Sequence, residues 1–237
     1  LVTIVEGFPS NVPISSEEIN HHLKRRQGGD GRSARMKIES DSVQILSGIR
    51  FGKTLGSPIS FLIENKDWAN WEEILSIEKL ARSIKKITIP RPGHADLVGV
   101  SKYNFDDIRN SIERSSARET AARVAAGSVA RKFLEHFGIY VGSFVESIGG
   151  LYSSNDHFNQ LLQNKISLGK TGWDISVKAD KSAVRVLDVS QEKKIINKIK
   201  SLKKSGDTLG GTFITIATGI PVGLGSFMHY DRRLDAD

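Results

Sequence analysis

The sequence contains no cysteine and no long hydrophobic run. Without cysteine, disulfides and thiolate metal sites are excluded. No apolar stretch approaches the roughly 18 residues of a membrane-spanning helix, and the first residues do not form a signal-peptide pattern. No histidine and carboxylate pair has metal-ligand spacing, so we expect no metal. These absences predict a cytoplasmic protein without a membrane partner.

The composition is that of a globular protein with an excess of positive charge. Of the 237 residues, 38% are hydrophobic and 26% are charged. A chain of this length is enough for one large domain or two modest ones. The formal net charge is +7. Such a charge suits a nucleic-acid binder, an acidic partner or an enzyme for multiply anionic small molecules, and charge alone does not choose among them.

Hydrophobic patterns and capping signals predict a mixture of strands and helices. Two sequences have capping-box spacing, Ser15 with Glu18 and Ser116 with Glu119. We expect helices over residues 16–26, 116–137 and 191–204, and strands over residues 2–6, 43–50, 58–64, 139–148 and 211–220. Because strands and helices alternate without a regular βαβ rhythm, the sequence indicates an α+β fold.

Six cations fall within residues 24–37, around a glycine-rich loop. The triplet at residues 24–26 fits a solvated helix end, where cations are favourable. Arg32 and Arg35 follow glycines that allow a ligand to approach the backbone, and arginine binds phosphate or carboxylate through two hydrogen bonds. For these two arginines a binding role and a structural role stay equally open. No aromatic residue is interleaved to stack on bases.

Residues 114–118 (Arg-Ser-Ser-Ala-Arg) suggest an anion site at the start of the helix expected over residues 116–137. The first turn of a helix offers free N–H groups and a partial positive charge. Ser115 and Ser116 add hydroxyl groups, and Arg114 and Arg118 would lie one turn apart on the same face. Capping alone accounts for Ser116 but leaves both arginines unexplained, which favours an anion site.

His94 lies on a glycine-bearing turn in Arg-Pro-Gly-His-Ala-Asp, residues 91–96. A lone histidine is more often structural than catalytic. An imidazole beside Arg91 and Asp96 can nevertheless exchange a proton at physiological pH, which makes His94 a candidate acid or base.

Several segments together resemble the chorismate synthase family. The two most specific are residues 91–96 and residues 114–127, which begin Arg-Ser-Ser-Ala-Arg-Glu-Thr. Further segments follow in the family order at residues 4–9, 25–27, 31–39, 45–59, 64–68, 223–226 and 231–236. The resemblance therefore spans nearly the whole chain.

The resemblance implies a lyase of the shikimate pathway, and so of aromatic amino-acid biosynthesis. Members convert 5-enolpyruvylshikimate 3-phosphate to chorismate and phosphate by a 1,4-elimination that needs reduced FMN without consuming it. Use of NADPH stays open, because many bacterial members receive reduced flavin from elsewhere. The implied fold is a β-α-β sandwich with antiparallel sheets and outer helices, in a single domain over residues 1–237 that forms a homotetramer.

The family motifs also imply roles for individual residues. His94 would hold or protonate the reduced flavin. The substrate would be held by Arg91, Arg118 and, less closely matched, Arg35. The residues implied for FMN are Arg114, Ser115 and Ser116, and those implied for NADP are Arg26 and Arg32.

The sequence departs from the family pattern at both ends. Members begin with a Gly-Glu-Ser-His-Gly segment, whose histidine is thought to protonate the leaving phosphate, and they continue after the position of Asp237 with further FMN contacts. We therefore expect a chain of these 237 residues alone to lack that first segment and the C-terminal part, and to have no lyase activity.

Two alternatives remain at this stage. One is a non-catalytic anion-binding or RNA-binding module that uses residues 24–37 and the basic helix at residues 193–204, with binding that weakens steeply in salt. The other is a flavin oxidoreductase, which would consume reduced flavin stoichiometrically. Replacing His94 by alanine should abolish turnover in an enzyme and scarcely affect an RNA binder.

Overall fold

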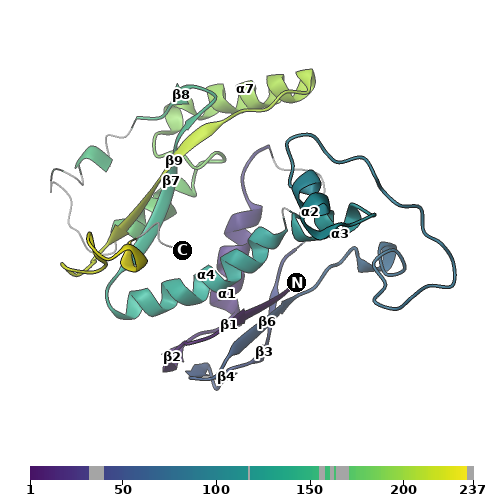
Figure 1. The fold of residues 1–237 in the computed structure, drawn as a ribbon. Coiled ribbons are helices and arrows are strands. Elements are labelled where there is room, and N and C mark those ends of the chain that lie inside the picture. Colours follow the sequence, from purple (N-terminus) through teal and green to yellow (C-terminus); the bar gives the residue numbers. More distant parts are fainter. Residues whose placement is uncertain (32–39, 117, 155–157, 161–162, 164–170, 234–237) are drawn as a thin grey trace. The chain divides into compact units, whose positions relative to one another are not determined.

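The computed structural model describes residues 1–31, 40–116, 118–154, 158–160, 163 and 171–233 (Figure 1). The chain divides into two compact units. The first unit comprises Leu1–Gln27 and Ser33–Val129, and the second comprises Gly28–Arg32 and Ala130–Asp237. That the two units form a single domain stays a prediction.

Two small antiparallel sheets form part of the first unit. One has the strand order β1-β6-β3, from β1 (Val2–Val5), β6 (Ile59–Ile63) and β3 (Val43–Ser47). The other has the order β2-β5-β4, from β2 (Ser10–Pro13), β5 (Lys53–Leu55) and β4 (Ile49–Arg50). Ile59, Phe61 and Ile63 alternate along β6 and are buried, as expected of a strand with one face in the core.

The first unit also contains α1 (Ser16–Gln27), the 3₁₀ turn η2 (Trp68–Asn70), α2 (Asp96–Tyr103) and α3 (Arg109–Arg114). The predicted capping box of α1 is present, because the backbone N–H of Glu18 donates to the Ser15 hydroxyl and the Glu18 carboxylate accepts from the Ser15 N–H. Helix α1 buries Ile19 and Leu23 and contacts β3.

Helix α4 (Glu119–His136) contains the boundary between the two units. Ala121, Ala125 and Val129 of its predicted apolar stripe are buried. The helix stops before Gly138, whose φ of 73° is the left-handed conformation expected after a helix. Phe137, the last residue of the helix predicted over residues 116–137, lies just after α4 and is 62% exposed.

The second unit is built on an antiparallel sheet of order β8-β7-β9, from β8 (Leu151–Tyr152), β7 (Tyr140–Ile148) and β9 (Gly211–Thr218). Helix α6 (Thr171–Ala179) packs Ile175 against Phe144 of β7. Helix α7 (Glu192–Ser205) follows η3 (Val189–Gln191) and buries Ile195. A last 3₁₀ turn, η4 (Tyr230–Arg232), follows β9.

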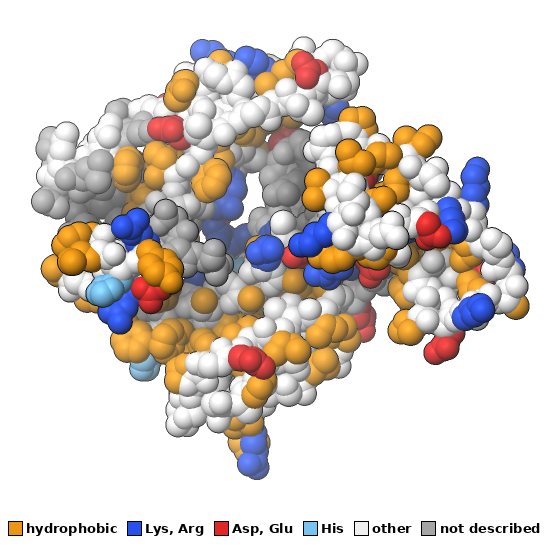
Figure 2. All heavy atoms as spheres, in the orientation of Figure 1, with side chains coloured by type: hydrophobic (Ala, Val, Ile, Leu, Met, Phe, Trp, Pro, Cys, Tyr) orange, Lys and Arg blue, Asp and Glu red, His pale blue; other side chains and the backbone are white. Residues whose placement is uncertain are grey.

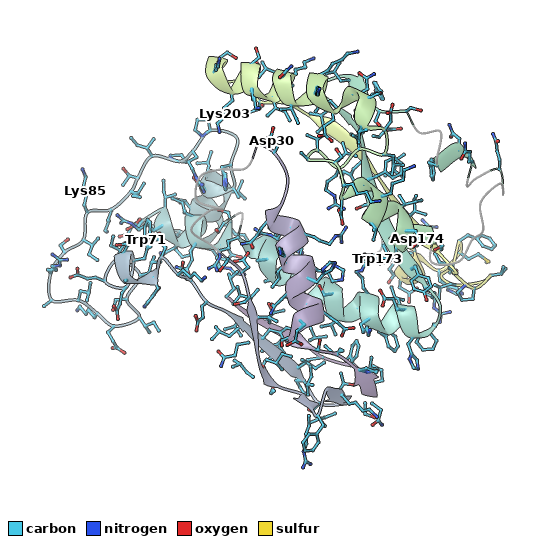
Figure 3. All side chains as sticks on the ribbon, turned by 180° about the vertical axis from the view of Figure 1, so that it is seen from behind. Asp30, Trp71, Lys85, Trp173, Asp174 and Lys203 are labelled. Atoms are coloured by element: carbon cyan, nitrogen blue, oxygen red, sulfur yellow. The ribbon has the colours of Figure 1, made fainter. Side chains whose placement is uncertain are left out.

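Close backbone packing joins α6 to β7. A Cβ atom at Gly142 of β7 would stand 1.5 Å from the carbonyl oxygen of Gly172 in α6, so no side chain fits there. Beside this contact, the guanidinium of Arg131 lies over the ring of Trp173, 4.6 Å from its centroid. Trp173 is labelled on α6 in Figure 3.

The predicted α+β class with antiparallel sheets is confirmed. The strands expected near residues 2–6, 43–50, 58–64, 139–148 and 211–220 and the helices near residues 16–26 and 191–204 are present. Strands β2 and β5 and helices α2, α3 and α6 were not predicted. None of the described helices has both the length and the hydropathy that crossing a bilayer requires.

Candidate functional site

The turn that carries His94 is held by a buried carboxylate. Asp96, the first residue of α2, is fully buried, and it accepts three hydrogen bonds from Arg91. Its Oδ2 accepts from the Arg91 backbone N–H (3.0 Å) and Nε (2.8 Å), and its Oδ1 accepts from Nη2 (2.8 Å). A carboxylate can be buried only with such partners. The hydrogen bonds from Arg91 hold the pKa of Asp96 well below its ordinary value.

The same turn fixes the tautomer of His94. The Ala95 backbone N–H donates to Nδ1 of the imidazole at 3.0 Å, and Arg91 Nη2 lies 3.2 Å from the same nitrogen. Since a backbone N–H can only donate, Nδ1 acts as the acceptor and the ring proton of the neutral imidazole is on Nε2. Nε2 is therefore the atom through which His94 can donate to a ligand.

Polar contacts and one close helix crossing position α2. Its buried residue is Asp96, whereas Leu97, Val98 and Tyr103 are exposed. Figure 2 shows hydrophobic side chains gathered over α2, with Lys and Arg side chains beside them. A Cβ atom at Gly99 would come within 2.3 Å of the Ser111 hydroxyl oxygen on α3, so the two helices touch at this glycine.

A second buried carboxylate holds Arg118. The side chain of Asp41 is 1% exposed and lies between two arginines. Its Oδ1 accepts from Arg118 Nη2 at 3.1 Å, and its Oδ2 accepts from Arg26 Nη1 at 3.0 Å. Arg118 Nη2 also donates to the carbonyl oxygen of Glu64. Arg26 Nε donates to the Thr120 hydroxyl at 2.9 Å, so this arginine links the end of α1 to the start of α4.

Residues 114–116 form a corner between two helices. Arg114 is exposed and is the last residue of α3. The hydroxyl and the backbone N–H of Ser115 both donate to the carbonyl of Ser111, at 2.7 and 2.9 Å. Both bonds belong to the last turn of α3, and the chain turns before α4 begins. The prediction that Arg114 and Arg118 lie one turn apart on a single helix is therefore wrong.

The capping box predicted for Ser116 and Glu119 forms only in part. The Ser116 hydroxyl accepts from the backbone N–H of Arg118 at 3.2 Å, and the N–H of Glu119 donates to the Ser116 carbonyl at 2.9 Å. Helix α4 consequently starts three residues after the predicted first residue. This tight turn places the Ser116 hydroxyl beside Arg118.

A pocket of ≈ 290 Å³ in the first unit is lined in part by Ser116 and Arg118. Trp68 and Trp71 contribute aromatic surface to the same lining, which also includes the carboxylate of Glu113. Arginine and a hydroxyl bind anions, and aromatic faces pack against planar rings. The lining therefore suits a planar molecule that carries negative charge, provided that its charge lies toward Arg118 and away from Glu113.

The ring of Trp71 is fixed in the pocket wall. Its Nε1 donates to Asp67 Oδ2 at 2.7 Å, and the other carboxylate oxygen of Asp67 accepts from Asn70. Figure 3 labels Trp71 on the segment around η2, and Lys85 on the long loop that leads toward α2. Neither tryptophan was among the residues predicted for the site.

The structure thus brings the predicted residues into two groups within the first unit. Arg91 and His94 share Asp96, while Arg118 and Ser116 lie together beside Arg26 and Asp41. Arg32 and Arg35 fall outside the described residues. Sequence reasoning missed Asp41, because a single aspartate in Glu-Ser-Asp-Ser carries no motif of its own. No cluster of three or more potential metal ligands occurs in the part of the chain that the structure describes.

Antiparallel sheets, helices and arginines held by buried aspartates define an α+β protein whose candidate site is suited to an anionic ligand. Comparison with known proteins gives the family. The family model described as chorismate synthase matches residues 1–237, and the chain belongs to the chorismate synthase family.

Curated relatives and a solved structure agree with this assignment. The chain is 53% identical over 238 residues to the chorismate synthase of Alkaliphilus metalliredigens and 49% identical over 239 residues to that of Enterococcus faecalis. Both matches cover 100% of this chain and 59% of the relative, so the chain spans about three fifths of the length of these proteins. A structure titled "Crystal Structure of Chorismate Synthase" matches with a TM-score of 0.72 and 40% identity, over 98% of this chain and 58% of the other.

Proposed function

We propose that this protein takes part in the shikimate pathway as a lyase that converts 5-enolpyruvylshikimate 3-phosphate to chorismate and phosphate. The observation that carries the proposal is the pair of fixed guanidinium groups, Arg91 and Arg118, in the same unit as a histidine whose tautomer is set by the backbone. Membership of the chorismate synthase family supports it.

The charge of the substrate explains why arginines are needed. The molecule carries two carboxylates and a phosphate, which must be taken out of water together. Guanidinium groups bind such anions through paired hydrogen bonds and keep their own charge at any physiological pH. Asp96 and Asp41 restrict the two arginines before the substrate arrives, so less ordering is left to be done on binding.

Reduced FMN is the cofactor that we propose. The pocket beside the corner fits it, since Trp68 and Trp71 offer surface for a planar ring while Ser116 and Arg118 offer contacts for an anion. Arg114 and Ser115, on the same corner, would help to hold it. When bound, reduced FMN would supply the electron density and the proton acceptance that breaking an unactivated carbon–hydrogen bond requires.

His94 would hold a ligand through its Nε2–H group. Its Nδ1 is already engaged by the Ala95 backbone N–H, so the imidazole presents one defined donor. We propose that this donor faces the reduced flavin or the substrate and hydrogen-bonds to it there. To supply a proton, the ring would first have to take up a second proton as the imidazolium, whose Nδ1–H would face Asp96 Oδ1, 3.4 Å away.

The other roles implied by the family remain part of the proposal. The cytoplasm is the proposed location and a homotetramer the proposed assembly. We propose Arg26 and Arg32 as the residues that would bind NADPH. To do so, Arg26 would have to exchange its contacts with Asp41 and Thr120, because its side chain is only 12% exposed.

The test is turnover under anaerobic conditions by the protein expressed from its own gene. With 5-enolpyruvylshikimate 3-phosphate and reduced FMN we expect chorismate and phosphate in equal amounts and no net loss of reduced flavin. Stoichiometric oxidation of the flavin would instead identify an oxidoreductase. Absence of both chorismate formation and substrate binding would refute the proposal.

A further inference from the structure

We propose that Asp41 is a positioning residue for Arg118 and that Arg26 acts with it, so that these two side chains set the orientation of one substrate-binding guanidinium. The proposal rests on the proposed function, because it concerns how the same site holds its anionic substrate. Its basis is the geometry around Asp41.

Asp41 is placed to orient two arginines at once. Its side chain is almost completely buried, and each carboxylate oxygen accepts a hydrogen bond from a different guanidinium, at 3.0 and 3.1 Å. Removing a buried carboxylate from such a position leaves its partners without their acceptor. The orientation of Arg118 therefore depends on Asp41.

Arg118 is restrained along one side of its guanidinium. Its Nη2 donates to Asp41 and also to the carbonyl oxygen of Glu64, and the side chain is 16% exposed. Arg118 also borders the pocket that Ser116, Trp68 and Trp71 line. Because the Arg118 guanidinium is held on one side and borders the pocket, it would meet a ligand in a fixed orientation.

Arg26 anchors Asp41 from the opposite side. Its Nη1 holds Oδ2 of the carboxylate, and its Nε donates to the Thr120 hydroxyl. The arginine lies in the last turn of α1 and Thr120 in the first turn of α4. The carboxylate that orients Arg118 is therefore fixed to two helices of the first unit.

Because the cluster is charged, the direction in which a substitution changes the substrate affinity tests the proposal. Arg26 and Arg118 are two cations, Asp41 is one anion, and together they leave one net positive charge near the pocket. Replacing Asp41 by asparagine raises that charge by one. If Asp41 acted only through charge, an anionic substrate would bind more tightly to the variant. If Asp41 positions Arg118, the substrate binds more weakly.

The experiment measures the Kd of 5-enolpyruvylshikimate 3-phosphate by calorimetry, without flavin, on the protein expressed from its own gene. We expect Asp41→Asn to raise Kd roughly tenfold, because misplacing a binding group by a fraction of an ångström is costly. A Kd that is unchanged or lower overturns the proposal. Asp180→Asn is the matched control, since Asp180 pairs with Arg185 at 2.9 Å in the second unit, and we expect no change in Kd.

A double-mutant cycle separates positioning from a general loss of structure. In an Arg118→Lys background, which lacks the planar fork, Asp41→Asn should have little further effect on Kd. Independent, additive effects would contradict action through Arg118. Thermal unfolding of each variant shows whether it is folded.

A milder variant keeps the proposal testable if Asp41→Asn does not fold. Thr120→Val removes the acceptor of Arg26 Nε and leaves every charge in place, so we expect it to raise Kd by about two- to threefold. An unchanged Kd in this folded variant overturns the proposal. If the parent protein neither binds the substrate nor forms chorismate, the proposed function fails and not the role of Asp41.

Discussion

Both units of this chain bury hydroxyl groups, but among the described residues only the first unit also buries carboxylates. Among the described residues, the first unit buries two carboxylates, Asp41 and Asp96, each hydrogen-bonded to arginine. The second unit buries the serines Ser147, Ser153, Ser176 and Ser182. Buried ion pairs rarely stabilise a fold better than apolar packing would. Their presence in the first unit, which also holds every described residue predicted for the site, supports the binding role that we propose for that site.

The units also differ in what their packing tolerates. In the second unit, Ser176 donates to the Ser143 carbonyl and accepts from the Ser143 N–H, while Gly142 and Gly172 bring α6 close to β7. That close packing requires residues with small side chains. In the first unit the arrangement around Arg91 and Arg118 depends on the charge of Asp96 and Asp41 and on the direction of their hydrogen bonds. Substitutions of charge should therefore affect function in the first unit, and substitutions of volume should affect stability in the second.

The largest effect should come from His94→Ala. We expect turnover to fall by about 100- to 10,000-fold with little change in stability, because a proton donor is lost from an exposed turn. Steady-state kinetics and thermal unfolding, on protein expressed from its own gene, measure the two quantities. His136→Ala, the same substitution at an exposed histidine of the second unit, is the control. Equal turnover in both variants would remove His94 from the mechanism.

The next largest effect should come from Gly142→Ala. The added methyl group would meet the backbone of Gly172 at 1.5 Å, so α6 must move away from β7. We expect the free energy of unfolding to fall by about 3 kcal/mol or more, the upper range for overpacking. Urea denaturation followed by circular dichroism measures the loss. A stability within 1 kcal/mol of the parent, a margin well below the usual cost of overpacking, would show that this contact is not tight.

Asp96→Asn should destabilise the first unit by a smaller amount, about 1–3 kcal/mol, because Arg91 loses a charged acceptor but is itself half-exposed and partly hydrated. The pH dependence gives a second readout. The folded-state pKa of Asp96 is depressed by the hydrogen bonds from Arg91, so its contribution is present at neutral pH. That contribution is lost as pH falls below the ordinary aspartate value of about 4.

Denaturation at several pH values therefore tests the role of Asp96. The stability difference between parent and Asp96→Asn should be greatest near pH 7 and should shrink on acidification below about pH 4. A difference that stays constant with pH would mean that the carboxylate charge does not contribute. Turnover of the variant should also fall, since both Arg91 and the His94 turn lose their support.

Gly127→Ala should produce the smallest effect and the opposite sign. Gly127 is exposed within α4, has no positive φ and has open space around its Cβ position. Alanine is favoured over glycine inside a helix by about 1 kcal/mol, so we expect a small rise in the unfolding midpoint. A loss of stability would mean that this face of α4 is covered. The comparison with Gly142→Ala separates conformational freedom from lack of space.

Elements with strong local signals could be predicted from the sequence. Helix α1 has a capping box and α7 has an apolar stripe at Ile195, Ile196 and Ile199, so their bounds were close to correct. Helix α2 could not be predicted, because its one buried residue is Asp96 and its apolar side chains face outward. Helix α3 is only six residues long and ends through a serine bond to its own backbone. Neither helix has the periodic apolar face on which prediction depends.

The residues of the candidate site could be predicted from the sequence, but the hydrogen-bond partners that orient them could not. His94, Arg91 and Arg118 stand in recognisable motifs, whereas the partners that orient them lie far away in sequence. Asp41 is 77 residues from Arg118, and the carbonyl of Glu64 is 54 residues away. Such pairs arise only when the sheets and helices of the first unit have formed. The break at Ser115 also escaped prediction, because a hydroxyl that ends one helix reads in sequence as a residue that begins the next.

The contact between Gly99 and Ser111 has a mechanical consequence. With no room for even a methyl group between them, α2 and α3 cannot slide past each other without separating. Movement of the serine corner toward a ligand would therefore be transmitted through α3 and α2 to the imidazole turn. If flavin and substrate bind as proposed, a ligand that moves the serine corner would also move the His94 turn, so the rate at which one ligand binds should depend on whether the other is already bound.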